Sequence, residues 1–157
     1  MTENDRMARQ LQHLTDRAEI TDLLDRFLRS LDVGVFDDAW GLAFFAEDAR
    51  ADMPIGAIQG REAVVASIRE GMARFDRTVH MGGNAVLEID GDRATAHHPQ
   101  LSTHILADDS ETLFISAGHA ETELVRTPDG WRISASALRI VWTQGRPPIV
   151  PADSGAA

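Results

Sequence analysis

Residues 20–32, ITDLLDRFLRSLD, set the architecture of the N-terminal half of this chain. Apolar residues recur there at intervals of three and four, so they share one face of an amphipathic helix. We predict a helix over residues 17–32, with Asp16 and Glu19 able to cap its start and Gly34 just beyond its end. The apolar face consists of Ile20, Leu23, Leu24, Phe27, Leu28 and Leu31.

Two further helical patterns and one extended segment follow this helix. A shorter helical pattern starts at Phe36 and is predicted to end near residues 47–48. Residues 49–58 form a short extended segment interrupted by a proline and a glycine, and Gly60 precedes a third helical run through residues 64–72. The first half of the chain is therefore predicted to be mainly helical.

The pattern changes at residues 82–84, GGN. From there, apolar and polar residues alternate in short runs separated by turn residues, as in antiparallel strands. An Asp-Gly pair at residues 90–91 favours a tight hairpin turn. We predict strands over residues 85–90, 93–106, 111–126 and 131–143.

Helices followed by strands indicate an α+β fold, in which helices pack on one face of a sheet. We expect a cone-shaped α+β barrel, with three N-terminal helices packed on a strongly curved, mainly antiparallel sheet. At 157 residues the chain has the length of one domain. We predict a single domain over residues 1–145, followed by an extended or disordered C-terminal arm over residues 146–157.

Composition excludes several kinds of function. The formal net charge of −10 argues against a nucleic-acid partner, because phosphates require basic surface. No apolar run is long enough to cross a membrane and the start is too polar for a signal peptide, so we expect a cytoplasmic protein without a membrane partner. The absence of cysteine excludes thiolate chemistry, which leaves carboxylates, imidazoles, hydroxyls or a cofactor.

The order of these elements, together with several segments, resembles the SnoaL-like branch of the nuclear transport factor 2-like superfamily. The likeness extends from about residue 15 to residue 142. It implies the cone fold and a homodimer or homotrimer, but it is much less specific for function, since this cone hosts dehydratases, isomerases, cyclases and binding proteins. The segments are RAEITDLLDRFLRSLDVGVFDDAW, FAEDAR, TVHMGGNAVLEIDGDRATA and GWRISASALRIVW.

The resemblance to scytalone dehydratase and bile-acid 7α-dehydratase type enzymes implies two catalytic positions. Asp32 matches their aspartate at the end of the first helix, and His80 matches their histidine at the start of the first long strand. Those enzymes also use a pocket tyrosine. This chain has no tyrosine, and the corresponding region offers Phe27.

The residues themselves leave the roles of Asp32 and His80 open. Asp32 follows the apolar face at the negative end of the helix dipole, where it could equally be exposed in a turn. His80 lies between two apolar residues and could be a core histidine bonded to a carbonyl. Within hydrogen-bond reach of each other, the two would form a general base with an orienting carboxylate.

Two more histidines lie on the strand predicted over residues 93–106. His98 and His104 share one face of it with Gln100 and Ser102, and that face either lines a pocket or is solvated. The resemblance favours His104 as a second catalytic histidine. No helical histidine pair with metal-ligand spacing is present, so we predict no metal site.

The resemblance also implies apolar residues that line the pocket. Arg139, between two apolar residues on the last strand, could point to solvent or could bind a substrate carbonyl or carboxylate. The predicted apolar lining residues are Phe27, Trp40, Met53 and Trp142.

These observations favour a cofactor-independent lyase or isomerase, such as a dehydratase or cyclase. Its substrate would be a hydrophobic, oxygenated small molecule, for example a polyketide, steroid-like or terpenoid intermediate, and its catalytic residues Asp32, His80 and His104. One alternative is a non-catalytic protein of the same fold that binds small molecules or takes part in assembly. Another is the small subunit of an oxygenase complex.

Overall fold

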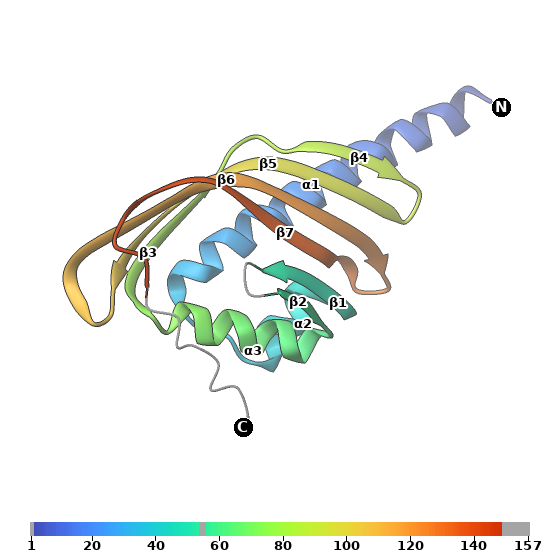
Figure 1. Cartoon of the computed structure of the whole chain (residues 1–157). Helices are drawn as coiled ribbons and strands as arrows, with labels where there is room; N and C mark the ends of the chain where they lie inside the picture. The colour runs from blue at the N-terminus through green and yellow to red at the C-terminus, as the bar shows by residue number, and fades with distance from the viewer. Residues whose placement is uncertain (1, 54–55, 149–157) are drawn as a thin grey trace.

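In the computed structural model, a long helix lies across the concave side of a curved sheet (Figure 1). The structure describes residues 2–53 and 56–148. The helices are α1 (Glu3–Val33), α2 (Asp38–Phe44) and α3 (Arg61–Met72). The strands are β1 (Phe45–Met53), β2 (Gly56–Gln59), β3 (Phe75–Gly82), β4 (Val86–Asp90), β5 (Arg93–Leu106), β6 (Asp109–Thr127) and β7 (Gly130–Gly145).

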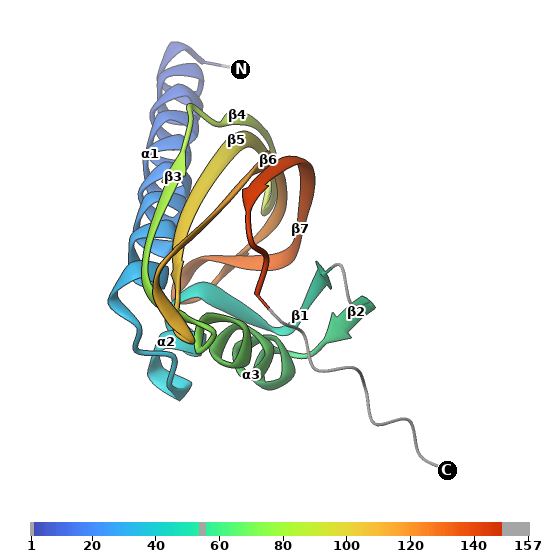
Figure 2. The ribbon, with the colours of Figure 1, turned by 60° about the vertical axis from the view of Figure 1, so that its left-hand side comes forward.

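The strands form one sheet in the order β2-β1-β7-β6-β5-β3, and β4 also pairs with β5. Neighbouring strands are antiparallel, except that β1 runs parallel to β7. Figure 2 shows α1 running alongside β3, while α2 and α3 lie at the end near β1 and β2. This arrangement confirms the predicted α+β cone with a mainly antiparallel sheet.

The first helix begins much earlier than predicted. Thr2 caps α1 in a reciprocal capping box with Asp5, so the helix gains 14 residues before the predicted start at residue 17. Residues 3–14 are exposed, and these turns extend beyond the sheet (Figure 1). The predicted end is correct, because Gly34 adopts a left-handed conformation with φ of 80° and closes the helix.

Asp16 is buried inside the helix and does not cap its start. Its Oδ1 accepts hydrogen bonds from Arg126 at 2.7 Å, from Gln12 at 3.0 Å and from the Trp131 indole at 3.3 Å. The Arg126 guanidinium lies 4.5 Å from the centre of the Trp131 ring. These contacts attach the middle of α1 to β6 and β7.

The structure differs from the prediction at the end of one helix and in one additional strand. The second helix ends at Phe44, before the predicted residues 47–48, because the buried Phe45 already begins β1 in its parallel pairing with β7. Strand β3 was not predicted, since its alternation falls within a segment attributed to the end of a helical half. β3 pairs along its length with β5 and brings His80 opposite Ser102.

The core lies between α1, α2, α3 and the sheet. Its largest fully buried side chains include Phe45, Ile20, Leu124 and Ile133. Within the described ranges, no helix combines the length and the apolar character that a membrane crossing requires. The division into residues 1–145 and 146–157 remains a prediction, since residues 149–157 lie outside the described part of the chain.

Candidate active site

A cavity of about 290 Å³ lies between α1, α3 and the concave face of the sheet. Most of its wall is apolar, and polar side chains from the sheet and from the turn after α3 interrupt it. The apolar wall includes Leu24, Leu28, Leu31, Ile68 and Met72. The polar wall includes Arg74, His80, His98, Gln100, Thr122 and Ser136. Such a cavity suits an apolar molecule with a few oxygen atoms.

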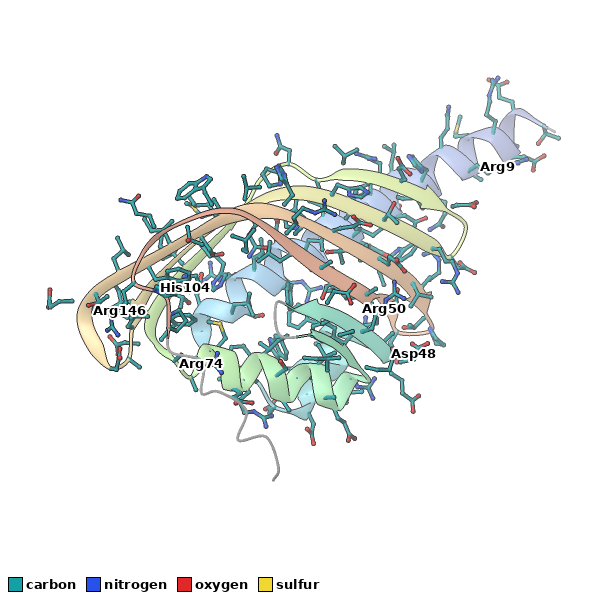
Figure 3. The ribbon with its side chains drawn as sticks, in the orientation of Figure 1. Arg9, Asp48, Arg50, Arg74, His104 and Arg146 are labelled. Atoms are coloured by element: carbon teal, nitrogen blue, oxygen red, sulfur yellow. The ribbon has the colours of Figure 1, made fainter. Side chains whose placement is uncertain are left out.

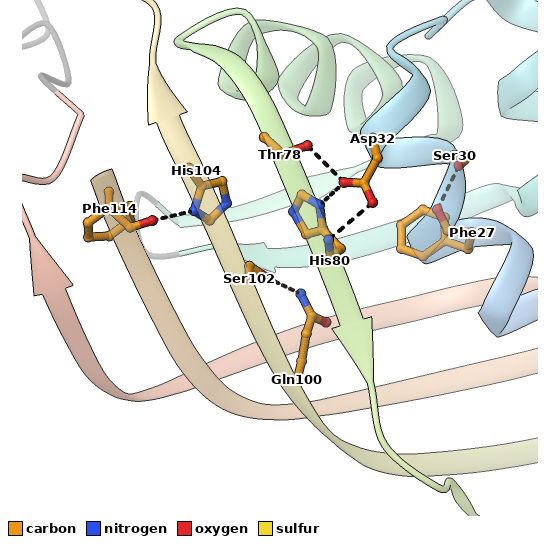
Figure 4. Close-up of polar contacts among 9 residues, drawn as sticks. All are labelled: Phe27, Ser30, Asp32, Thr78, His80, Gln100, Ser102, His104 and Phe114. Atoms are coloured by element: carbon orange, nitrogen blue, oxygen red, sulfur yellow. Dashed lines mark hydrogen bonds and ion pairs between the residues drawn. The ribbon is translucent and has the colours of Figure 1, made fainter. Parts of the chain in front are cut away.

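Asp32 and His80 form a hydrogen-bonded pair at this wall (Figure 4). His80 Nδ1 lies 2.7 Å from Asp32 Oδ1, and the His80 backbone N–H donates to Asp32 Oδ2 at 3.1 Å. The Thr78 hydroxyl also donates to Asp32 Oδ1, at 2.8 Å. Asp32 closes α1 and His80 lies on β3, so tertiary packing joins the two elements at this point.

The surroundings of Asp32 keep its carboxylate ionised. Burial alone would raise the pKa of Asp32, but the hydrogen bonds from the His80 ring, the His80 backbone and Thr78 together lower it below the ordinary value. A carboxylate only accepts hydrogen bonds, so His80 Nδ1 carries the proton of that bond. The lone pair of Nε2 is then free to accept a proton. Only 6% of the His80 side chain is exposed to solvent.

His104 packs beside this pair. Its ring centre lies 5.3 Å from that of His80, edge to face, and 4.3 Å from that of Phe75. Its Nδ1 lies 3.2 Å from the Phe114 carbonyl oxygen, which accepts a hydrogen bond from it. Burial and then the nearby His80 lower the pKa of His104, so the ring is neutral at pH 7. Figures 3 and 4 show it next to β3.

The structure brings two other predicted residues to the cavity. Phe27 lines it from α1 and packs against Phe44 and Phe45 with ring centres 5.6 and 5.7 Å away. His98 lines it from β5, and its Nδ1 lies 3.3 Å from the Pro99 carbonyl. The polar face predicted for β5 therefore contributes to the wall of the cavity.

Trp40 does not line the cavity, in contrast to the prediction. It is buried in the core, where its indole N–H donates to Ser30 Oγ at 2.9 Å and its ring packs against Phe36. The side chain of Met53, also predicted to line the pocket, lies outside the described residues.

Arg139 and Trp142 lie on the opposite, outer face of the sheet, so their predicted places in the pocket were wrong. A β-bulge explains the position of Trp142: Ala117 pairs with Trp142, whereas the next residue, Gly118, pairs with Ile140. The extra residue on β7 reverses the alternation of side chains. Gly118 permits the bulge, since a Cβ atom there would lie 2.1 Å from the carbonyl oxygen of Arg139.

Thr78 and Arg74 are parts of the site that the sequence analysis missed. Thr78 could have been found, because it lies two residues before His80 and therefore on the same face of a strand. Arg74 follows α3, and the sequence around it shows no pattern that indicates a cavity residue. Among residues 2–53 and 56–148, no cluster of three or more His, Asp or Glu side chains could hold a metal ion.

The fold and the site define a class of protein: an α+β cone with a cavity lined by a histidine that is hydrogen-bonded to an aspartate. The chain belongs to the SnoaL-like domain family, whose model matches residues 12–137. It is 30% identical over 131 residues to the uncharacterized protein Rv2910c of Mycobacterium tuberculosis, a match that covers 82% of this chain and 88% of that protein.

Solved structures support the same fold. One is a hexachlorocyclohexane dehydrochlorinase, LinA Type2, with a TM-score of 0.78, 21% identity and coverage of 94% of this chain and 99% of that chain. Another is a scytalone dehydratase-like protein from Novosphingobium aromaticivorans, with a TM-score of 0.78, 20% identity and coverage of 92% and 97%. At these identities the likeness establishes the fold alone.

Proposed function

We propose that the protein is a cofactor-independent lyase or isomerase, of the dehydratase or cyclase kind, that acts on a hydrophobic, oxygenated small molecule. The observation that carries the proposal is the His80–Asp32 pair, 2.7 Å apart, at the wall of a largely apolar cavity. A general base needs such an orienting partner and a pocket that excludes water. The dehydrochlorinase and dehydratase-like names of two structural neighbours support elimination as the reaction class.

In the proposed reaction His80 Nε2 removes a proton from the carbon next to a substrate carbonyl. The electron pair of the C–H bond forms an enolate, and Asp32 stabilises the imidazolium. The enolate then expels a hydroxyl group from the adjacent carbon, and the imidazolium returns its proton to that group to give water and an unsaturated ketone. Ring closure or isomerisation would use the same proton transfers. Because the tyrosine is missing, the side chains of Gln100, Thr122 and Ser136 are the donors on the wall that we propose for the carbonyl oxygen.

The test uses apolar cyclic ketones and β-hydroxyketones in D₂O. Deuterium exchange next to the carbonyl is followed by NMR, and water loss by the absorbance of the unsaturated product. We expect His80→Ala to reduce the rate by about 10²–10⁴-fold, the usual contribution of a general base. His119→Ala is the matched control, because His119 is exposed on the outer face of the sheet. A rate unchanged in His80→Ala, or no exchange with any compound, would favour the non-catalytic binding role.

We also propose that the protein forms a homodimer or homotrimer through the outer face of the sheet. The strand pairing places Met81, Leu101, Ala117 and Trp142 in one row across β3, β5, β6 and β7. Met81 and Trp142 are about half exposed, at 50% and 49%. Contiguous apolar surface of this kind is typical of a protein–protein interface, and a second copy would cover it.

A further inference from the structure

Arg74 is held at the cavity by its backbone. It lies just after the end of α3, where the chain turns into β3 (Figure 3). Its N–H donates to the Gly71 carbonyl at 3.3 Å, and its own carbonyl accepts from the Ala107 N–H at 2.9 Å. These two bonds attach the residue both to α3 and to the turn between β5 and β6. The base of the side chain is therefore fixed, although the residue lies outside any helix or strand.

The guanidinium of Arg74 has few partners. Its side chain is only 27% exposed and lines the cavity. Its one ionic contact within residues 2–53 and 56–148 is with Glu70 at 3.9 Å, and Glu70 is 78% exposed. That distance is too long for a hydrogen bond, and an exposed pair of this kind contributes little stability. The guanidinium therefore keeps most of its five N–H donors available for a further acceptor.

Other partly buried arginines in the described chain differ from Arg74. Arg69, Arg126 and Arg132 each donate hydrogen bonds to a carbonyl or carboxylate oxygen of the protein. None of the Arg74 nitrogen atoms is among the fully buried polar atoms without a partner in the described residues, so these N–H groups are open to solvent and to a bound molecule. An acceptor supplied by a bound molecule would satisfy the donors of Arg74.

The charges on the cavity wall restrict what that acceptor can be. Asp52 on β1 also lines the cavity, and no ion pair joins it to Arg74. An anionic group would therefore be attracted toward Arg74 and repelled from Asp52. Among the described residues of the wall Arg74 is the single arginine or lysine, which favours a singly charged group over a multiply charged phosphate. A single carboxylate matches a single guanidinium in charge and in bidentate geometry.

We infer that Arg74 binds a carboxylate of the substrate, so that the substrate class of the proposed enzyme is an apolar carboxylic acid. The reaction of this acid rests on the proposed function, whereas its binding by Arg74 does not. Arg74 would hold the acidic end of the molecule, the apolar wall would enclose its carbon skeleton, and the carbon acid would face His80. Arg74 acts here as a specificity-determining residue and takes no part in proton transfer.

The test compares the binding of 2-naphthoate and 2-naphthamide at pH 7 by calorimetry. The two probes have the same ring system and nearly the same shape, but only the acid is charged. We expect the wild-type protein to bind the acid about tenfold or more tightly than the amide, as a charge-assisted bidentate contact predicts. Arg74→Gln should abolish this preference and leave the affinity for the amide nearly unchanged. Arg77→Gln is the matched control, because Arg77 is an exposed arginine that pairs with Asp76 and does not line the cavity.

Three outcomes would overturn the inference: equal binding of the two probes, a preference that survives in Arg74→Gln, or no binding of the acid at millimolar concentration. The wild-type comparison stays decisive even if the variant folds poorly. Exchange that depends on His80 but shows no acid preference would remove Arg74 from the scheme and leave the proposed reaction standing. If the acid preference depends on Arg74 but deuterium exchange is unaffected by His80→Ala, the proposed reaction is wrong and the carboxylate-binding role of Arg74 stands.

Discussion

At the scale of single residues, the site depends on keeping His104 neutral beside His80. Both rings lie in one aromatic cluster with Phe75 and Phe114. Burial disfavours the charged form of His104, and a protonated His80 would repel a second positive charge. The lowered pKa of His104 makes this ring hard to protonate, so a proton taken up by His80 is not passed on to the neighbouring ring.

The lowered pKa of His104 predicts a pH dependence of stability. The unfolded chain takes up a proton near the ordinary pKa of 6.5, whereas the folded protein resists it. His104 therefore does not destabilise the protein above pH 6.5. As the pH falls below that value, the free energy of unfolding decreases. We expect His104→Phe to reduce the difference in unfolding free energy between pH 7.5 and pH 5.5, by about 1 kcal/mol for each pKa unit involved.

Urea denaturation at the two pH values measures this difference. His119→Phe provides the comparison, since His119 is exposed on the outer face. A pH dependence that is the same in His104→Phe and in the wild-type protein would contradict the assignment of a neutral, buried His104.

At the scale of elements, the contacts of Asp16 decide how α1 is attached to the sheet. Burial would raise the pKa of Asp16, but hydrogen bonds from Arg126, Gln12 and Trp131 outweigh it and lower the pKa. The stabilisation is therefore present above about pH 4 and is lost as the pH falls further. Asp16→Asn should lower the free energy of unfolding at pH 7 by about 2–4 kcal/mol, because it removes the buried charge partner of the Arg126 guanidinium and leaves only the exposed Asp92.

Denaturation of Asp16→Asn and Asp92→Asn provides the measurement and its control. Asp92 pairs with the same arginine at 2.9 Å, but its side chain is 78% exposed. Its loss should therefore cost less than about 1 kcal/mol. Equal losses in the two variants would show that burial of Asp16 contributes nothing special to the docking of α1.

The elements also show what could be predicted from the sequence. The apolar face of residues 20–31 predicted the core-facing part of α1, since that part packs on the sheet. Residues 3–14 have no such contacts, and only the capping box of Thr2 and Asp5 marks their start. The positions of Asp32 and His80 followed from the family resemblance. Trp142 was placed wrongly because a bulge opposite Gly118 reverses alternation, and Arg74 was missed because only tertiary packing brings it to the cavity.

At the scale of the whole molecule, the outer face of the sheet should control assembly. We expect the wild-type protein to sediment as a dimer or trimer, and Trp142→Glu to sediment mainly as a monomer, because a carboxylate would be buried in the apolar row. Leu42→Glu is the control, since Leu42 is also exposed, at 54%, but lies on α2. A monomeric wild-type protein, or an unchanged assembly of Trp142→Glu, would refute the proposed interface.

The pairing of Asp32 with His80 has one more consequence. The carboxylate comes from the last turn of a helix and the imidazole from a strand about 50 residues further on, so neither element contains the base by itself. A partly folded chain with both elements formed but not yet packed would have a histidine without its partner. Proton transfer would then begin only when the helix has docked in the correct register. The activity of the protein would thus report the completion of folding, and it would be lost before secondary structure during gradual unfolding.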